Sequence, residues 1–353
     1  MAIPANEPLV DRRQRARRTH WVLSFVLLAV AMLSLTTGAT GMTLFATLSK
    51  VLAGEPLTQL EKIVFWDIRG PRLVLGLLVG ASLAVSGAVM QGIFRNPLAD
   101  PGLIGVGAGA GLGAITAIVL GGFLPAVVAG LIGYWLVPIA AFFGGWVSTF
   151  ILYRVSTRHG RTSVATMLLA GIALGALAGA VSGILIYLAD DNQLRDLTFW
   201  GLGSLAGATW SKVLVAGPMI GIAMVAALFL GRGLNGLSLG EAAAFHLGVN
   251  VQRLKNGAVM TVAAATGGAV AVAGGIGFIG IIVPHLLRLA TGPDHETLLI
   301  NAALLGAIFL LLADLIARVI VAPAELPIGI VTAVIGAPVF LWILLRRRGL
   351  VDL

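Results

Sequence analysis

Apolar segments of membrane-spanning length follow one another along almost the whole chain, separated by short polar stretches. A helix needs about 20 apolar residues to cross the hydrocarbon core of a bilayer. Positions 101–153 contain no charged residue and must hold two such segments, with a turn at Gly121, Gly122 and Pro125. We predict ten transmembrane helices, at residues 21–41, 72–94, 101–119, 125–153, 164–189, 211–231, 255–275, 277–290, 297–318 and 327–345.

The composition supports an all-α polytopic membrane protein. Of the 353 residues, 58% are hydrophobic and only 11% are charged, which excludes a soluble domain of this size. The apolar runs are continuous rather than alternating, which disfavours a transmembrane β-barrel. The chain has no cysteine, so disulfides and thiolate metal sites are excluded.

The distribution of basic residues predicts the orientation in the membrane. With ten helices both termini lie on one side, and that side carries 16 of the 23 lysines and arginines. Because basic loops stay in the cytoplasm, we place both termini there. Residues 1–20 then form a basic cytoplasmic N-terminus, residues 21–348 a ten-span membrane domain, and residues 232–254 its longest cytoplasmic connection.

The most informative block surrounds the second predicted helix. It begins with Arg69-Gly70-Pro71-Arg72, continues through 22 uncharged residues and ends with the segment 95–101, Arg-Asn-Pro-Leu-Ala-Asp-Pro. The predicted orientation places Arg69 and Arg72 outside and the segment 95–101 inside. Polar Ser82, Ser86 and Gln91 within this helix would be unnecessary in a simple membrane anchor.

Glycines recur every fourth residue in two of the predicted helices. One set comprises Gly171, Gly175, Gly179 and Gly183, and the other Gly76 and Gly80. This spacing places the glycines of a set on one helix face, where a second backbone can approach closely. We interpret both sets as packing sites within the chain, with a contact between subunits as the alternative.

The ninth predicted helix carries two charges near its outer end, Asp314 and Arg318. Their spacing of four permits an ion pair on one helix face. Charged residues inside a membrane also mark functional pathways, so both pairing and outward display of Arg318 are considered.

Other candidate chemistry is sparse. None of the five histidines pairs with another at metal-ligand spacing, and only His285, beside Pro284, remains as a possible ligand. The phosphate-binding motif of ATPases is absent, and the two G-x-G-x-x-G matches lack a β-α-β context. The sequence also makes two predictions about local backbone structure. Non-helical backbone is predicted at Gly274, Gly275 and Gly277. A short amphipathic helix is predicted at residues 240–248.

The ordered motifs of the chain resemble the permease subunits of type II ABC importers, which carry iron–siderophores, haem and cobalamin. The similarity covers about residues 20–348. It rests on the 69–101 block, with Gly105 and Gly107, and on later motifs in the same order. These are Leu168-Leu169-Ala170-Gly171, Phe199-Trp200, Gly203-Ser204-Leu205, Gly277-Phe278-Ile279-Gly280, Pro284-His285-Leu286-Leu287-Arg288, Glu325-Leu326-Pro327-Ile328-Gly329 and Gly336-Ala337-Pro338.

This resemblance implies a homodimer in the bacterial inner membrane with a central translocation path. Two copies of a cytoplasmic ABC ATPase would bind below and a periplasmic substrate-binding protein above. The chain itself would be a transport subunit, not an enzyme, without a cofactor or metal of its own, since ATP and Mg²⁺ belong to the ATPase.

The resemblance also implies roles for individual residues. Docking of the binding protein would use Arg69, Arg72 and Arg318. A cytoplasmic gate would involve Asn96, Leu98, Val164 and Ala165. Coupling to the ATPase would use Glu241, Ala242, Ala243, Phe245, Leu247 and Gly248.

The segment 188–200 most resembles the haem permeases of the family, so import of haem is the predicted function. Permeases for cobalamin or ferric siderophores are the alternative. An ion-coupled secondary transporter is a competing class, but Asp314 is the only candidate for a coupling acid. A membrane enzyme is disfavoured because the chain lacks a nucleophile–base or metal constellation.

Overall fold

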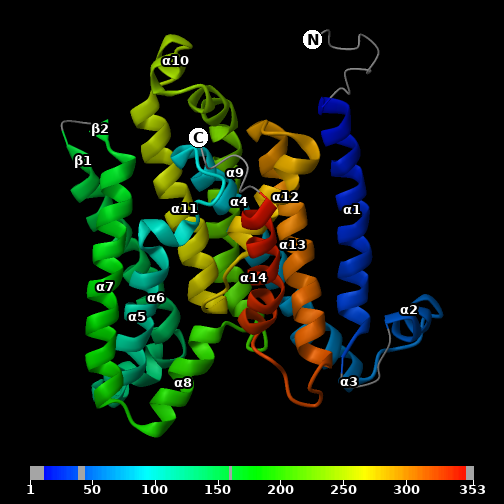
Figure 1. Ribbon diagram of the computed structural model, residues 1–353. Coiled ribbons are helices and arrows are strands. Elements are labelled where there is room, and N and C mark those ends of the chain that lie inside the picture. Colours follow the sequence, from blue (N-terminus) through cyan, green and yellow to red (C-terminus); the bar gives the residue numbers. More distant parts are fainter. Residues whose placement is uncertain (1–11, 39–43, 159–160, 347–353) are drawn as a thin grey trace.

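A computed structural model describes residues 12–38, 44–158 and 161–346, and these residues form a helical bundle (Figure 1). Ten longer helices coincide with the ten predicted segments. Eight helical segments are long and apolar enough to cross a bilayer, while α12 and α14 are shorter apolar helices, so ten crossings remain a prediction. The ten are α1 (Arg12–Thr36), α4 (Gly70–Phe94), α5 (Val106–Leu120), α6 (Ala126–Ser156), α7 (Val164–Leu188), α9 (Trp210–Ser238), α11 (Val251–Ala273), α12 (Ile279–Thr291), α13 (His295–Val319) and α14 (Ile328–Arg346).

Short elements connect these helices. They are α2 (Leu44–Leu52), α3 (Gln59–Lys62), α8 (Asp191–Leu202), α10 (Glu241–His246), and single 3₁₀ turns at Pro101–Ile104 and Gly121–Phe123. Two short strands, β1 (Thr157–Arg158) and β2 (Arg161–Thr162), pair antiparallel. This pair was not predicted from the sequence, because two residues are too few to show a periodic pattern.

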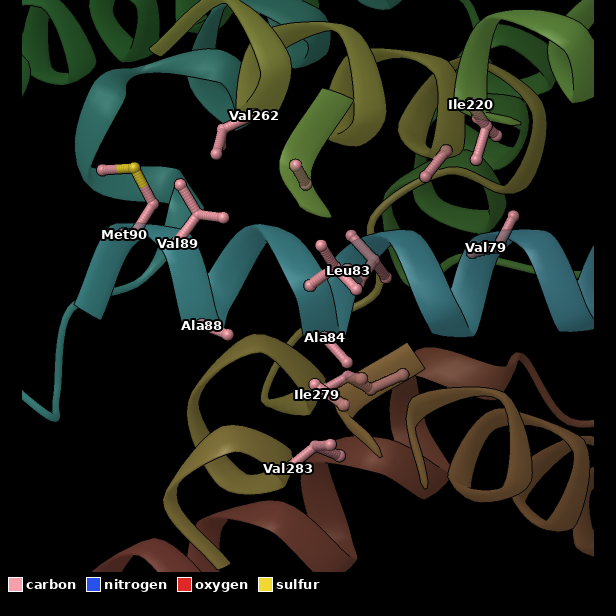
Figure 2. Close-up of a cluster of buried hydrophobic side chains, with 14 of the residues drawn as sticks. Val79, Leu83, Ala84, Ala88, Val89, Met90, Ile220, Val262, Ile279 and Val283 are labelled. Carbon is pink, nitrogen blue, oxygen red and sulfur yellow. The ribbon is translucent and has the colours of Figure 1, made fainter. Parts of the chain in front are cut away.

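Helix α4 lies at the centre of the bundle. Figure 2 shows its buried side chains between α12, which contributes Ile279 and Val283, and the helices α9 and α11 on the opposite side. Helix α13 approaches α4 so closely that a Cβ atom on Gly80 would stand 2.4 Å from the carbonyl oxygen of Gly306. The predicted packing role of this glycine set is therefore confirmed.

A π-helical turn, η1 (Ile63–Arg69), joins α3 to α4 without a break. Pro71 has no N–H to donate and its ring crowds the carbonyl four residues earlier. The hydrogen-bonding ladder accommodates it by widening, and the Gly70 N–H donates to the carbonyl of Phe65, five residues back. The predicted external connection thus contains helix up to the start of α4.

The backbone between α11 and α12 is non-helical, as the glycines predicted. Gly274 adopts a φ of 73°, a conformation that side chains other than glycine rarely tolerate. Ser204 N–H donates to the Ala273 carbonyl at 2.8 Å, so the end of α11 is hydrogen-bonded to the segment after α8. This contact positions α8 beside the break.

Three of the four α7 glycines make no close contact within the chain. A Cβ atom added to Gly175, Gly179 or Gly183 would meet nothing within 4 Å. For these three positions the interpretation as an intramolecular packing site is therefore wrong within one protomer. The alternative of a contact with another subunit remains.

The two ends of the bundle are distinct. Helix α1 begins, and α14 ends, at the end that also holds α10 and the β1–β2 pair (Figure 1). Helices α2, α3 and α8 lie at the opposite end. The charge distribution predicts that the first end is cytoplasmic, and the two ends are called cytoplasmic and outer below.

Candidate functional site

Five charged residues meet at the outer end of the bundle, and we call them the arginine cluster: Arg69, Arg72, Asp314, Arg318 and Glu325. Asp314 on α13 is the centre of this cluster and is fully buried. Its Oδ1 accepts from Nη2 of Arg72 at 2.8 Å, and its Oδ2 accepts from Nη2 of Arg318 at 2.7 Å. One carboxylate thus joins α4 to α13 and also forms the ion pair predicted on α13.

The other two members complete the cluster from its edges. Glu325, in the connection between α13 and α14, accepts from Nη1 of Arg72 at 2.9 Å, and its side chain is 36% exposed. Arg69 donates to the carbonyls of Leu35 and Thr36 at the end of α1. Arg318 also donates to Ser34 Oγ at 2.8 Å, so two arginines hold the end of α1.

All three arginines are buried, with exposed fractions of 4% for Arg69, 6% for Arg72 and 9% for Arg318. A cavity of about 170 Å³ opens beside them, lined by the three arginines, Glu325 and Pro323. Among the described residues of the cluster, three cations face two carboxylates, so positive charge is in excess there.

Sequence reasoning located the three arginines at one end and found the Asp314–Arg318 pair. It missed the bond from Arg72 to Asp314, since these residues are separated by 242 positions. It also missed Glu325 as a partner of Arg72. The available signal was that Glu325 opens one of the motifs on which the family resemblance rests.

The segment after α4 forms the predicted gate loop at the cytoplasmic end. Arg95 ends α4 in the left-handed conformation at φ 48°, and Asn96 Oδ1 then accepts from the Leu98 N–H at 2.9 Å. Asp100 Oδ1 accepts from Gly102 N–H at 2.7 Å. Burial raises the pKa of the Asp100 carboxyl above its usual range, although this hydrogen bond opposes the shift.

A buried hydrogen-bond network holds the cytoplasmic end of α4. Arg288 on α12 donates to Gln91 Oε1, and its Nη2 lies 3.3 Å from Nε2 of His295. His295 Nδ1 lies 3.0 Å from Asn235 Oδ1 at the end of α9. Because arginine only donates, His295 must accept at Nε2 and carry its proton on Nδ1. The network therefore connects α4, α12, α13 and α9.

The other two predicted gate residues, Val164 and Ala165, open α7 behind the N-cap Ser163. In the described part of the chain no hydrogen bond joins either to Asn96 or Leu98. Helix α7 packs against the turn Pro101–Ile104, which follows the gate loop. A gate formed by these four residues remains a prediction.

The predicted short helix on the cytoplasmic side is present as α10. Its base is fixed by Glu241, whose Oε1 accepts from Lys255 Nζ at 2.7 Å, and the same Nζ donates to the Thr162 carbonyl. Phe245 and Leu247 project outward, with exposed fractions of 72% and 64%. Ala242 and Gly248 are also exposed, and Ala243 is half-buried. Two large apolar side chains are therefore exposed at this helix, and its contact with the ATPase remains a prediction.

A cavity of about 430 Å³ lies beside α8 and the break between α11 and α12. Its lining includes Asp100, Trp200, Thr266 and Phe278. His285 is buried and lies outside that lining. Among the described residues, no three histidine or acidic side chains converge as metal ligands. The geometry provides a mainly apolar cavity with one carboxyl group, that of Asp100, in its lining.

Comparisons with known proteins match nearly the whole chain. The sequence profile of the FecCD transport family matches residues 26–346. The hemin transport system permease protein HmuU of Yersinia pestis is 43% identical over 327 residues, which cover 93% of this chain and 96% of that protein. The vitamin B12 import system permease protein BtuC of Salmonella typhi is 42% identical over 336 residues, covering 95% and 98%.

A solved structure gives the same result for the fold. A metal-chelate type ABC transporter in an inward-facing conformation has a TM-score of 0.82 and 31% identity, and the match covers 94% of this chain and 99% of that one.

Proposed function

The chain belongs to the FecCD transport family, whose members here are permease components of ABC importers, and on this premise we propose that it imports haem across the bacterial inner membrane. The observation that carries the proposal is the 43% identity to a hemin permease over 93% of the chain. The segment 188–200, which resembles haem permeases, forms α8 and lies beside the 430 Å³ cavity.

Cobalamin import is the second candidate, because a vitamin B12 permease is 42% identical over a similar length. One percentage point does not separate the two substrates. Both are large, planar-ring metal complexes, and a mainly apolar cavity suits either of them.

In the proposed cycle the energy comes from a separate ATPase. Its contact with this chain would be α10, where Phe245 and Leu247 are exposed and Glu241 is anchored by Lys255. A periplasmic binding protein would dock at the arginine cluster through its own carboxylates. Docking and ATP binding would together switch the permease between outward- and inward-open states.

A homodimer is part of the proposal. The open glycine face of α7 supports it, because glycine costs a helix about 1 kcal/mol relative to alanine and contributes nothing against lipid. A second backbone approaching this face would explain the glycines. The gate residues Val164 and Ala165 at the start of α7 would then face Asn96 and Leu98 across the dimer.

Uptake by proteoliposomes tests the function directly. The permease, its ATPase and its binding protein are reconstituted, and uptake of haem, cobalamin and a ferric siderophore is measured with and without ATP. We expect ATP-dependent uptake of haem, and a catalytically inactive ATPase as control should abolish it. Uptake of cobalamin alone would favour the second candidate, and uptake driven by an ion gradient without ATP would contradict an ABC importer.

A further inference from the structure

The seam between α1 and α13 contains a pocket at the cytoplasmic end of the bundle. Its volume is about 220 Å³, and its lining includes Arg17, His20 and Trp21 from α1 with Thr297 and Asn301 from α13. Helix α1 runs along the periphery of the bundle beside α13 (Figure 1). None of the transport roles proposed above uses this pocket.

Side-chain contacts across the seam fix the shape of the pocket. His20 Nδ1 lies 3.3 Å from Asn301 Oδ1, and Asn301 Nδ2 donates to the Ala16 carbonyl at 3.3 Å. Asn301 is 1% exposed, so α1 is held against α13 by a buried amide. Arg17, His20 and Trp21 have the i, i+3, i+4 spacing of one helix face and therefore project into the same space.

Among the described residues, no acidic side chain neutralises the positive charge around this pocket. The sequence places five arginines between positions 12 and 18. Arg15, Arg17 and Arg18 are exposed, and none of them forms an ion pair within the described residues. The two acids at the start of α13 are engaged elsewhere, because Glu296 accepts from Arg232 and Asp294 accepts from Asn235.

The pocket lies at the depth of lipid headgroups. From Arg17 to the end of α1 at Thr36, a helix rises about 28 Å, close to the hydrocarbon thickness of a bilayer. Below the pocket the outer face of α1 is apolar, with Trp21 at 69%, Phe25 at 73% and Leu28 at 57% exposure. A tryptophan between arginines and an apolar stripe is typical of the membrane interface.

We propose that this pocket binds the phosphate headgroup of an anionic phospholipid. Arg17 supplies charge-assisted hydrogen bonds to the phosphate oxygens, and the acyl chains lie along Trp21, Phe25 and Leu28. The apolar stripe that continues from the pocket favours a lipid over free phosphate, which would gain nothing from it. The bound lipid would fasten the peripheral helix α1, whose other end is held by the arginine cluster.

Lipid retention by the purified full-length chain tests the proposal. Native mass spectrometry measures binding of phosphatidylglycerol and of phosphatidylcholine with the same acyl chains, for the wild type and for Arg17→Gln. We expect the wild type to prefer phosphatidylglycerol, and Arg17→Gln to weaken its binding about five-fold, since one interfacial arginine contributes about 1 kcal/mol. Phosphatidylcholine binding should be equal in both proteins.

Arg15→Gln is the matched control, because Arg15 is exposed on the same helix but does not line the pocket. It should change phosphatidylglycerol binding less than about two-fold at 0.5 M salt, where unbound charges are screened. An equal loss in Arg15→Gln would overturn the pocket in favour of diffuse attraction. Equal retention of phosphatidylcholine by the wild type, or displacement of the lipid by millimolar inorganic phosphate, would overturn the lipid assignment.

Discussion

Helices α4 and α7 have the same length and a similar apolar, glycine-rich composition, but opposite surroundings. Each has 25 residues, most of them apolar, and carries glycines at intervals of four. In the most apolar window of the helical segment Gln59–Phe94, which contains α4, 78% of the residues are buried inside the protomer. In the corresponding window of α7 the buried share is 11%. In a membrane, lipid and protein interior are equally apolar, so hydrophobicity does not distinguish a helix at the centre from one that awaits a partner.

The polar contacts of the two helices express the same difference. Helix α4 begins with Arg72, bound to Asp314, and ends near Gln91, bound to Arg288. In the described structure α7 is capped by Ser163 and ends before the α8 cap Asp190, without an ion pair to another helix. A helix anchored at both ends is a fixed part of the protomer, whereas α7 is positioned mainly by packing along one side.

Removing the anchor of α4 should have the largest effect on the protomer. Asp314→Asn keeps the shape of the side chain but leaves the guanidinium groups of Arg72 and Arg318 buried without their shared carboxylate. We expect a loss of about 3–5 kcal/mol in the free energy of unfolding, measured by denaturant titration in detergent. Glu296→Gln is the control, because its pair with Arg232 is exposed and should cost less than about 1 kcal/mol. Equal small losses in both variants would show that the cluster does not anchor α4.

Adding a large side chain where α4 and α13 pack closely should have the next largest effect on stability. Gly80→Leu forces a side chain against the backbone of Gly306, where even a Cβ atom would stand at 2.4 Å. The helices must separate, and we expect a loss of about 1–3 kcal/mol or more, seen as a lower midpoint of thermal unfolding. An unchanged midpoint would mean that α13 can move away without cost, against the dense packing around α4.

The same substitution on α7 sharpens the comparison. A Cβ atom at Gly179 would meet nothing within 4 Å in the protomer, so Gly179→Leu should change the thermal midpoint no more than an ordinary surface substitution does. If α7 faces a second copy, the added side chain should instead separate the dimer. Cross-linking in membranes and mass photometry in detergent would measure this. A dimer that persists in Gly179→Leu would assign the α7 face to lipid and contradict the proposed interface.

Local chemistry made part of this structure predictable. Long apolar runs located the ten helices, glycines marked the break before α12, and Gly240 with Gly248 bounded the short helix α10. The pair Asp314–Arg318 followed from a spacing of four on one helix. Each of these features depends on residues that are close in sequence.

Long-range partners could not be predicted in the same way. The contact of Arg72 with Asp314, the network from Gln91 to Asn235 and the empty face of α7 depend on how helices are arranged in space. The spacing of four between glycines predicted close packing both at Gly80, which packs against α13, and at Gly179, which contacts no other helix of the protomer closely. Burial of the three arginines was also missed, since basic residues at a helix end usually face water.

Among the described residues, the contact between Glu325 and Arg72 is the one replaceable contact at the anchored outer end of α4. Its removal should have the smallest effect on stability. Glu325 is 36% exposed and accepts from Arg72 at the edge of the cluster, so an incoming carboxylate must compete with it. Glu325→Gln should change the free energy of unfolding by less than about 1 kcal/mol, because Asp314 still holds Arg72. If the arginine cluster docks a binding protein, the same change should tighten docking up to about five-fold at low salt, measured by surface plasmon resonance. Weaker docking in Glu325→Gln would show instead that Glu325 positions Arg72 for the partner. The outer end of α4 would then need both of its carboxylate contacts for docking, and neither would be replaceable.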